Sequence, residues 1–177
     1  MEKILTMISA YISQKLTDQV LDEEPIEAKP GAEELLKYLR KGVRTAIATA
    51  GGVERSSSLL KRVGLYDYLD HIVSARQVAH GKPAPDVYLY ACSQLHVQPQ
   101  ECYAVEDSPN GIHSAYSAGC KVFMVPDLTQ PDAELEKLYT KSGITCSTKG
   151  VFLNFFLQSL ELCDKTDYKR NYIRDVR

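Results

Sequence analysis

The chain has 177 residues, 44% of them hydrophobic and 25% charged, and its formal net charge at pH 7 is -2. This length and apolar share suffice for one domain with a full core. The small net charge argues against a basic surface for nucleic acid or an anionic membrane, and no apolar run is long enough to span a bilayer.

The cysteine pattern indicates the compartment. The five cysteines are odd in number and show no C-x-x-C spacing. This pattern favours free thiols in a reducing compartment over a disulfide framework or a zinc site. The first residues lead into an amphipathic pattern rather than into the apolar core of a signal peptide. We therefore expect a cytoplasmic protein.

Helices and strands are predicted to alternate along most of the chain. Apolar residues at helical spacing predict an amphipathic helix over residues 2–21, followed by an extended segment. Further helices are predicted at 32–41, 84–95 and 109–118, and one more contains Leu59, Leu60 and Val63 and ends at Gly64. Strands are predicted at 45–48, 71–73, 102–105 and 121–125. This alternation indicates βαβ units and an α/β fold with a Rossmann-like parallel sheet and helices on both of its faces.

The C-terminal part gives weaker signals. Residues 144–146 are consistent with a last short strand and residues 151–162 with a buried helix, whereas residues 164–177 are dense in charge and typical of a mobile tail. We divide the chain into an N-terminal helical segment (1–24), an α/β core (25–163) and the charged tail (164–177).

Two adjacent carboxylates, Glu106 and Asp107, follow an apolar strand directly. Ser108 can cap the next helix, and Pro109 suits its first turn. The acids should therefore lie at the carboxyl end of a strand, where ligands bind in open parallel sheets and where oxygen atoms can hold a hard cation such as Mg²⁺. On its own, the pair fits a solvated acidic turn equally well.

A second cluster, Thr49-Ala50-Gly51-Gly52, also follows a strand. A hydroxyl beside glycines lets the backbone approach an anion, and the next helix offers its positive N-terminal end. An ordinary strand-to-helix turn is the more common reading of such a cluster alone.

A third cluster is Gly81-Lys82-Pro83-Ala84-Pro85-Asp86. Pro83 restricts Lys82 to an extended conformation, so the ammonium group has a defined direction and could offset the charge of a phosphate. A surface lysine in a proline-rich loop is the alternative. The scattered histidines are expected to be surface or capping groups, and the tyrosines, Tyr88 among them, to pack with the hydroxyl outward.

The order of these clusters resembles the haloacid dehalogenase-like superfamily, and within it the β-phosphoglucomutase and sugar-phosphatase branch. The resemblance covers about residues 30–127 and rests on Gly-Lys-Pro-Ala-Pro-Asp and Val-Glu-Asp-Ser-Pro-Asn-Gly-Ile. It implies that Thr49 and Lys82 are catalytic, that both bind the phosphoryl group together with Ala50 and Gly51, and that Glu106 and Asp107 hold Mg²⁺. The helix at 2–21 is similar to the last helix of the family's small cap.

The chain departs from the family at the nucleophile. In the family, an N-terminal strand carries an Asp-x-Asp motif whose first Asp attacks phosphorus and whose second is general acid and base. No Asp-x-Asp occurs in this sequence. We therefore expect a family member that begins inside its cap and lacks its central strand. A truncated gene product, a misplaced start codon and half of a split protein all fit this pattern.

Two hypotheses about function follow. The first is Mg²⁺-dependent phosphoryl transfer, as a phosphatase or a phosphomutase, on a small phosphorylated metabolite, with this chain inactive alone because the nucleophile is absent. The second is a non-catalytic phosphate- or Mg²⁺-binding remnant, or a subunit completed by another chain. In either case, a sheet that lacks its central strand would expose edges through which the chain could self-associate.

Overall fold

The computed structural model describes residues 25–29, 31–125 and 145–146. Its α-helices are α2 (Ala32–Leu39), α3 (Val53–Arg62), α4 (Asp86–Gln94) and α5 (Pro109–Ala118). Its strands are β1 (Ala46–Thr49), β2 (His71–Ser74), β3 (Tyr103–Glu106), β4 (Lys121–Met124) and β5 (Thr145–Cys146). Short 3₁₀ turns occupy Tyr66–Tyr68, Ala75–Gln77 and Pro99–Glu101.

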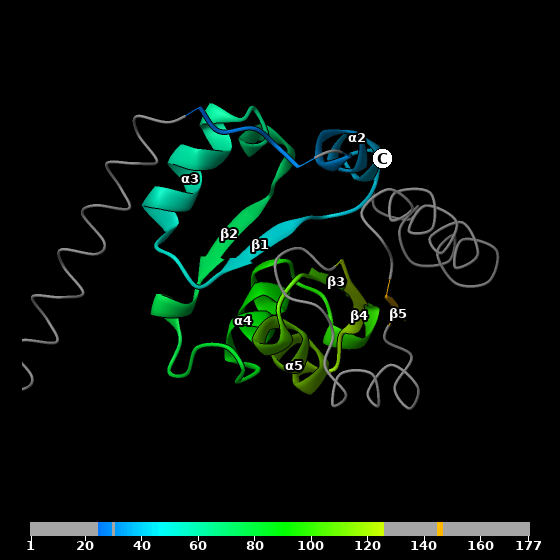
Figure 1. The fold of residues 1–177 in the computed structure, drawn as a ribbon. Helices are drawn as coiled ribbons and strands as arrows, with labels where there is room; N and C mark the ends of the chain where they lie inside the picture. Colours follow the sequence, from blue (N-terminus) through cyan, green and yellow to red (C-terminus); the bar gives the residue numbers. More distant parts are fainter. Residues whose placement is uncertain (1–24, 30, 126–144, 147–177) are drawn as a thin grey trace, which may run out of the picture.

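All the described strands pair in parallel and form two sheets (Figure 1), which agrees with the expected parallel sheet that has a gap beside the Glu106 strand. β1 pairs with β2, with Thr49 opposite Ser74 at the carboxyl ends. β3, β4 and β5 form the second sheet in that order, with Glu106 opposite Met124. The predicted α/β class with parallel strands is confirmed, whereas β1 and β3 do not pair with each other.

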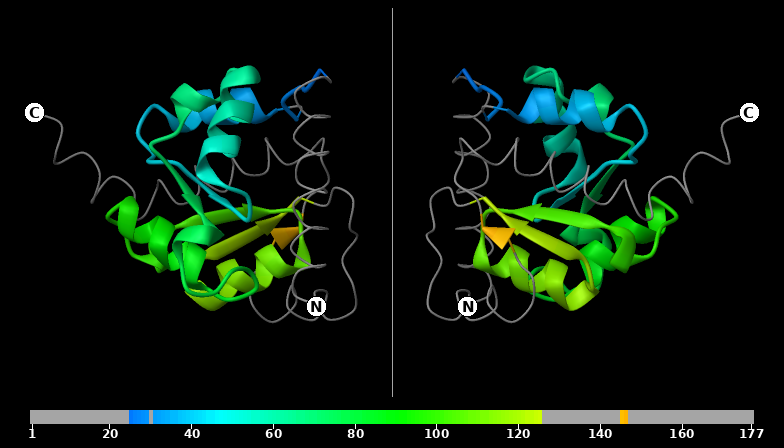
Figure 2. Two further views of the ribbon diagram at one scale, coloured as in Figure 1. Left: turned by 90° about the vertical axis from the view of Figure 1, so that its left-hand side faces the viewer. Right: turned by 90° about the vertical axis from the view of Figure 1, so that its right-hand side faces the viewer.

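Helices α4 and α5 connect the two sheets. α3 packs against β2, α4 packs against β1, β2 and α5, and α5 packs against β3 and β4 (Figure 2). The main core lies along these contacts and includes Val73, Val87, Ile112 and Met124, all nearly inaccessible to solvent. The packing of α4 against α5 therefore sets how the carboxyl ends of β1 and β3 face each other.

The boundaries differ from the prediction in ways that affect the site. Thr49 and Glu106 are the last residues of their strands instead of following them. A strand residue has its backbone held by the ladder, so these two side chains start from fixed positions. α4 begins at Asp86, two residues later than expected, because Pro85 occupies its N-cap.

Several predictions fall outside the described residues: the helix at 2–21 with the proposed cap, the helix at 151–162 and the tail at 164–177. The strand expected at 144–146 is present at Thr145–Cys146. Within the described part, no helix combines the length and the hydropathy needed to cross a membrane.

We expect the purified chain to self-associate. In the described residues, β1 and β3 each pair on one side only, and an unpaired edge offers backbone N–H and C=O groups to a second strand. Size-exclusion chromatography with light scattering, run over a concentration series, should show mass rising with concentration. A constant monomer mass, together with two-state unfolding, would contradict this expectation.

Candidate functional site

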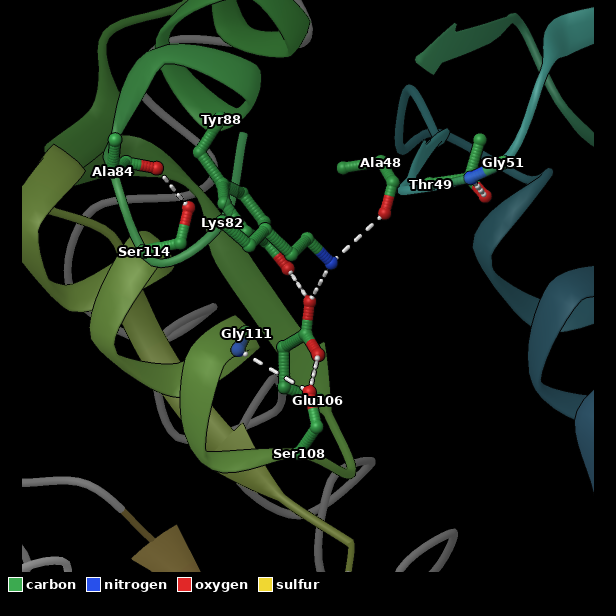
Figure 3. Close-up of polar contacts among 10 residues, drawn as sticks. All are labelled: Ala48, Thr49, Gly51, Lys82, Ala84, Tyr88, Glu106, Ser108, Gly111 and Ser114. Atoms are coloured by element: carbon green, nitrogen blue, oxygen red, sulfur yellow. Dashed lines mark hydrogen bonds and ion pairs between the residues drawn. The ribbon is translucent and has the colours of Figure 1, made fainter. Parts of the chain in front are cut away.

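Lys82 bridges the two sheets. Its Nζ donates a hydrogen bond to the Ala48 carbonyl oxygen in β1, at 3.0 Å, and another to Glu106 Oε1 at the end of β3 (Figure 3). Only 15% of the Lys82 side chain is exposed. A lysine in a solvated surface loop would not have these partners, so the structure supports the reading in which the ammonium group is held in place.

Glu106 is the shared acceptor at the centre of the site. Its Oε1 accepts hydrogen bonds from Lys82 and from the Tyr88 hydroxyl, and its Oε2 lies 3.5 Å from the Ser108 hydroxyl (Figure 3). The residue is 8% exposed. Burying a carboxylate is costly unless donors replace the water it loses, and here an ammonium and a phenol do so.

Tyr88 was expected to point its hydroxyl outward, and this was wrong. α4 places Tyr88 in the core, where its hydroxyl reaches Glu106 and where the Lys82 ammonium lies 5.2 Å from the centre of its ring. Burial, and then the nearby charge of Glu106, raise the pKa of Tyr88 far above its usual value. Tyr88 therefore remains a hydrogen-bond donor over the whole range of physiological pH.

Gly111 leaves the space that Glu106 occupies. A Cβ atom at Gly111 would lie 1.8 Å from Glu106 Oε2, well inside any allowed contact. The helix around Gly111 begins as predicted: the Ser108 side chain caps it by accepting from Gly111 N–H at 3.2 Å, and Pro109 occupies its first turn. Only glycine lets the first turn of α5 approach the carboxylate this closely.

The Lys82 loop is also attached to α5. Ser114, fully buried on α5, donates a hydrogen bond to the Ala84 carbonyl oxygen at 2.5 Å. This contact holds the segment after Lys82 against the helix that follows Glu106. Sequence reasoning missed Ser114, because a serine inside a helix carries no local sign of a partner 30 residues away.

Thr49 lies at the end of β1, close to the carbonyl that Lys82 binds. Its Oγ1 accepts a hydrogen bond from Gly51 N–H at 3.0 Å. Ser74, at the end of β2 and also missed, donates to the Gly51 carbonyl oxygen at 2.5 Å. Both contacts hold the turn in place. The Gly51 N–H already donates to Thr49 Oγ1, so the Thr49 hydroxyl proton is the donor that this turn can offer to an anion. Ala50, the residue between them, is exposed.

The two acids differ in environment. Glu106 is buried and hydrogen-bonded, whereas Asp107 is exposed at the end of β3. Their oxygen atoms suit a hard cation such as Mg²⁺. No group of three or more His, Cys, Asp or Glu side chains within the described ranges is arranged to hold a metal ion. The pair therefore fits part of a Mg²⁺ site, and a full coordination shell would need further oxygen ligands.

Comparison with known proteins identifies relatives of one kind. A model of the haloacid dehalogenase-like hydrolases matches residues 4–119. Hexitol phosphatase A of Escherichia coli is 39% identical over 127 residues, which cover 68% of this chain and 58% of that protein. The probable pseudouridine-5'-phosphatase of Drosophila melanogaster is 40% identical over 124 residues, covering 66% of this chain and 54% of that protein. The chain thus spans less than two thirds of the length of these relatives.

Solved structures give the same result. The putative beta-phosphoglucomutase of Thermotoga maritima superposes with a TM-score of 0.70 at 25% identity, covering 87% of this chain and 70% of that one. CbbY of Rhodobacter sphaeroides, solved in complex with phosphate, superposes with a TM-score of 0.63 at 28% identity, covering 72% of this chain and 56% of that one. The observed arrangement of parallel strands and helices is therefore the fold of these proteins.

Replacing Gly111 with alanine should lower the free energy of unfolding by about 2 kcal/mol, the middle of the range for overpacked sites, because the new methyl group displaces Glu106. Urea unfolding followed by circular dichroism measures the change. Asn110→Ala, at the exposed neighbouring position, is the control and should change stability by less than about 0.5 kcal/mol. Equal effects of the two substitutions would show that the close approach of Gly111 to Glu106 is not tight.

Replacing Tyr88 with phenylalanine should lower the free energy of unfolding at pH 7 by about 1–2 kcal/mol, because buried Glu106 loses a donor. The exposed Tyr116→Phe is the matched control.

Tyr88 should also contribute a pH dependence of stability. Its folded pKa is raised, so the unfolded chain releases this proton first, and the contribution of Tyr88 is complete below about pH 10 and lost as the pH rises further. The loss of stability at alkaline pH should be smaller in Tyr88→Phe than in the wild type or in Tyr116→Phe. Titration of tyrosinate absorbance should show that Tyr88 ionises only on unfolding, as the difference between the wild type and Tyr88→Phe. A difference that appears near the ordinary tyrosine pKa in the folded protein would contradict the buried position of Tyr88.

Proposed function

Because the chain belongs to the haloacid dehalogenase-like hydrolase family, we propose that it takes part in Mg²⁺-dependent phosphoryl transfer on a small phosphorylated metabolite. Hexitol phosphatase A of Escherichia coli and the phosphorylated carbohydrates phosphatase of Thermotoga maritima support a sugar-phosphate phosphatase. The likeness to a putative beta-phosphoglucomutase supports a phosphomutase as the second form of the proposal.

The fixed position of Lys82 is the observation that carries this proposal. A largely buried ammonium group lies at the carboxyl ends of β1 and β3, bonded to the Ala48 carbonyl oxygen and to Glu106. The carboxyl end of a parallel sheet is where such folds bind their ligands, and a positive charge there suits a phosphoryl group. Its contacts to both strands mean that little reorganisation is needed when the anion binds.

Thr49 would bind the phosphoryl group beside Lys82. Gly51 N–H fixes the position of the Thr49 oxygen, which leaves the hydroxyl proton to be donated to a phosphoryl oxygen. In this arrangement Gly51 orients the hydroxyl and leaves room for the anion, and the exposed Ala50 adds backbone to the same turn.

Glu106 and the exposed Asp107 would hold the Mg²⁺ ion. Glu106 Oε1 is bonded to Lys82 and Tyr88 and Oε2 packs against Gly111 near the Ser108 hydroxyl, so Glu106 would exchange one of these contacts for the metal. When bound, Mg²⁺ would supply positive charge to the phosphoryl oxygens. Glu106 would therefore have two tasks, to orient the ammonium group of Lys82 and to contribute an oxygen ligand beside Asp107.

We propose that the nucleophile belongs to a strand with an Asp-x-Asp motif that completes the site between β1 and β3, in the same polypeptide or in another. The unpaired edges of these two strands in the described structure support this position. Without that strand, the site residues that the structure describes would bind a phosphoryl group and offset its charge but offer no placed carboxylate nucleophile. The alternative is a non-catalytic subunit that binds phosphate or Mg²⁺.

The test is release of phosphate from an aryl phosphate in the presence of Mg²⁺. The unextended chain should show negligible turnover, and a fusion that carries an N-terminal strand with Asp-x-Asp should be active. Within that fusion, Lys82→Ala should lower kcat about 100-fold or more, as expected for removal of a charge-stabilising group. Asp107→Asn should weaken the dependence on Mg²⁺, and the exposed Lys61→Ala should leave turnover unchanged.

Three outcomes would change the proposal. Turnover by the unextended chain that Asp107→Asn abolishes would mean that an unidentified nucleophile is present. An inactive, folded fusion that still binds inorganic phosphate would favour the non-catalytic subunit. Equal activity of Lys82→Ala and Lys61→Ala would remove the role given to Lys82.

A further inference from the structure

Three cysteines that are far apart in the sequence meet away from the candidate site. Cys92 lies on α4, Cys102 immediately precedes β3, and Cys120 immediately precedes β4. The Sγ atoms of Cys92 and Cys102 are 3.5 Å apart, within hydrogen-bonding distance for sulfur. Cys92 and Cys120 are buried, whereas Cys102 is partly exposed. The core therefore holds a reduced pair of thiols with one member at the surface.

The surroundings of Cys92 favour its thiolate. Cys92 lies within hydrogen-bonding distance of Cys102, whose own thiol donates to the Gln98 carbonyl oxygen at 3.4 Å. The contacts of Cys92 with Cys102 and Cys120 lower the pKa of Cys92, and burial only partly opposes this effect. The same contacts raise the pKa values of Cys102 and Cys120. A thiolate beside a thiol is the arrangement needed for oxidation followed by disulfide closure.

Metal binding does not account for this cluster. Among the residues that the structure describes, no three Cys, His, Asp or Glu side chains are placed to share a metal ion. A disulfide needs only two sulfurs and an S–S bond of about 2.05 Å, so Cys92 and Cys102 would have to approach by about 1.5 Å from their present separation.

We propose that Cys92 and Cys102 form a redox-active dithiol that hydrogen peroxide oxidises to a disulfide. The Cys92 thiolate attacks one peroxide oxygen: an S–O bond forms, the O–O bond breaks, and the departing hydroxide takes up a proton to become water. Cys102 then attacks the sulfenic sulfur of Cys92: the S–S bond forms, the S–O bond breaks, and the Cys102 proton leaves with the hydroxide as a second water. The two thiols supply the two electrons that reduce the peroxide.

The bridge would join two elements that carry site residues. Cys92 is one helical turn after Tyr88 on α4, and Cys102 begins the segment whose β3 strand ends at Glu106. Oxidation would therefore link the helix of the phenol donor to the strand of its acceptor. The partly exposed Cys102 is the sulfur that a reducing thiol would attack to open the bridge.

The full chain tests the proposal. It is treated with hydrogen peroxide, its remaining thiols are alkylated, and it is digested without reductant for mass spectrometry. We expect the free-thiol count to fall from five to three, the peptides of Cys92 and Cys102 to be joined, and dithiothreitol to restore all five thiols. Cys163→Ser is the matched control: it should form the same bridge with a starting count one lower.

Single cysteine substitutions distinguish the Cys92–Cys102 disulfide from disulfides formed by other cysteines. After peroxide treatment, Cys102→Ser should no longer join the peptide of Cys92 to the peptide that carries position 102. Cys120→Ser should still form the Cys92–Cys102 disulfide. Circular dichroism checks that each variant is folded. If one variant is unfolded, the disulfide found by mass spectrometry in the wild-type chain still decides between the proposal and its alternatives. A main disulfide from Cys92 to Cys120, a disulfide between two chains, or oxidation to sulfinic acid without a bridge would overturn the proposal.

Discussion

A buried carboxylate that accepts hydrogen bonds from two donors joins the elements of this structure at the candidate site. Glu106 accepts from the Lys82 ammonium and from the Tyr88 hydroxyl, and Lys82 in turn donates to the Ala48 carbonyl oxygen. Each group would be costly to bury without the others, because each has given up water. The hydrogen bonds among these groups connect β1 and α4 to β3, whereas no strand pairing in the described structure joins β1 to β3.

This network depends on two small side chains in α5. Gly111 has no Cβ atom where the Glu106 carboxylate lies, and Ser114 binds the Ala84 carbonyl oxygen in the loop that follows Lys82. The helix thus fits closely against both the acid and the segment that carries its cationic partner. A preorganised ammonium group results, as the proposed electrostatic stabilisation of a phosphoryl group would require. The same close packing explains why small changes in α5 should affect the site.

The candidate site and the thiol pair lie at opposite ends of β3. Glu106 ends the strand, and Cys102 immediately precedes its first residue. α4 runs along both, with Tyr88 facing the carboxylate and Cys92 facing the second thiol one turn later. The candidate site and the thiol pair would therefore share α4 and β3. A disulfide at Cys92 would act on α4, the helix that positions the Tyr88 hydroxyl against Glu106.

The sequence alone determined the features that are local. Apolar residues at helical spacing and short apolar runs indicated the described α-helices and strands. Ser108 and Pro109 marked the start of α5, because caps and first-turn residues act on neighbouring backbone. The parallel α/β class followed from the alternation of elements. Only the tertiary structure showed that Tyr88 faces Glu106, that Lys82 joins β1 to β3, and that Ser114 holds the loop after Lys82. These features depend on contacts between residues distant in sequence, and neither composition nor periodicity records such contacts.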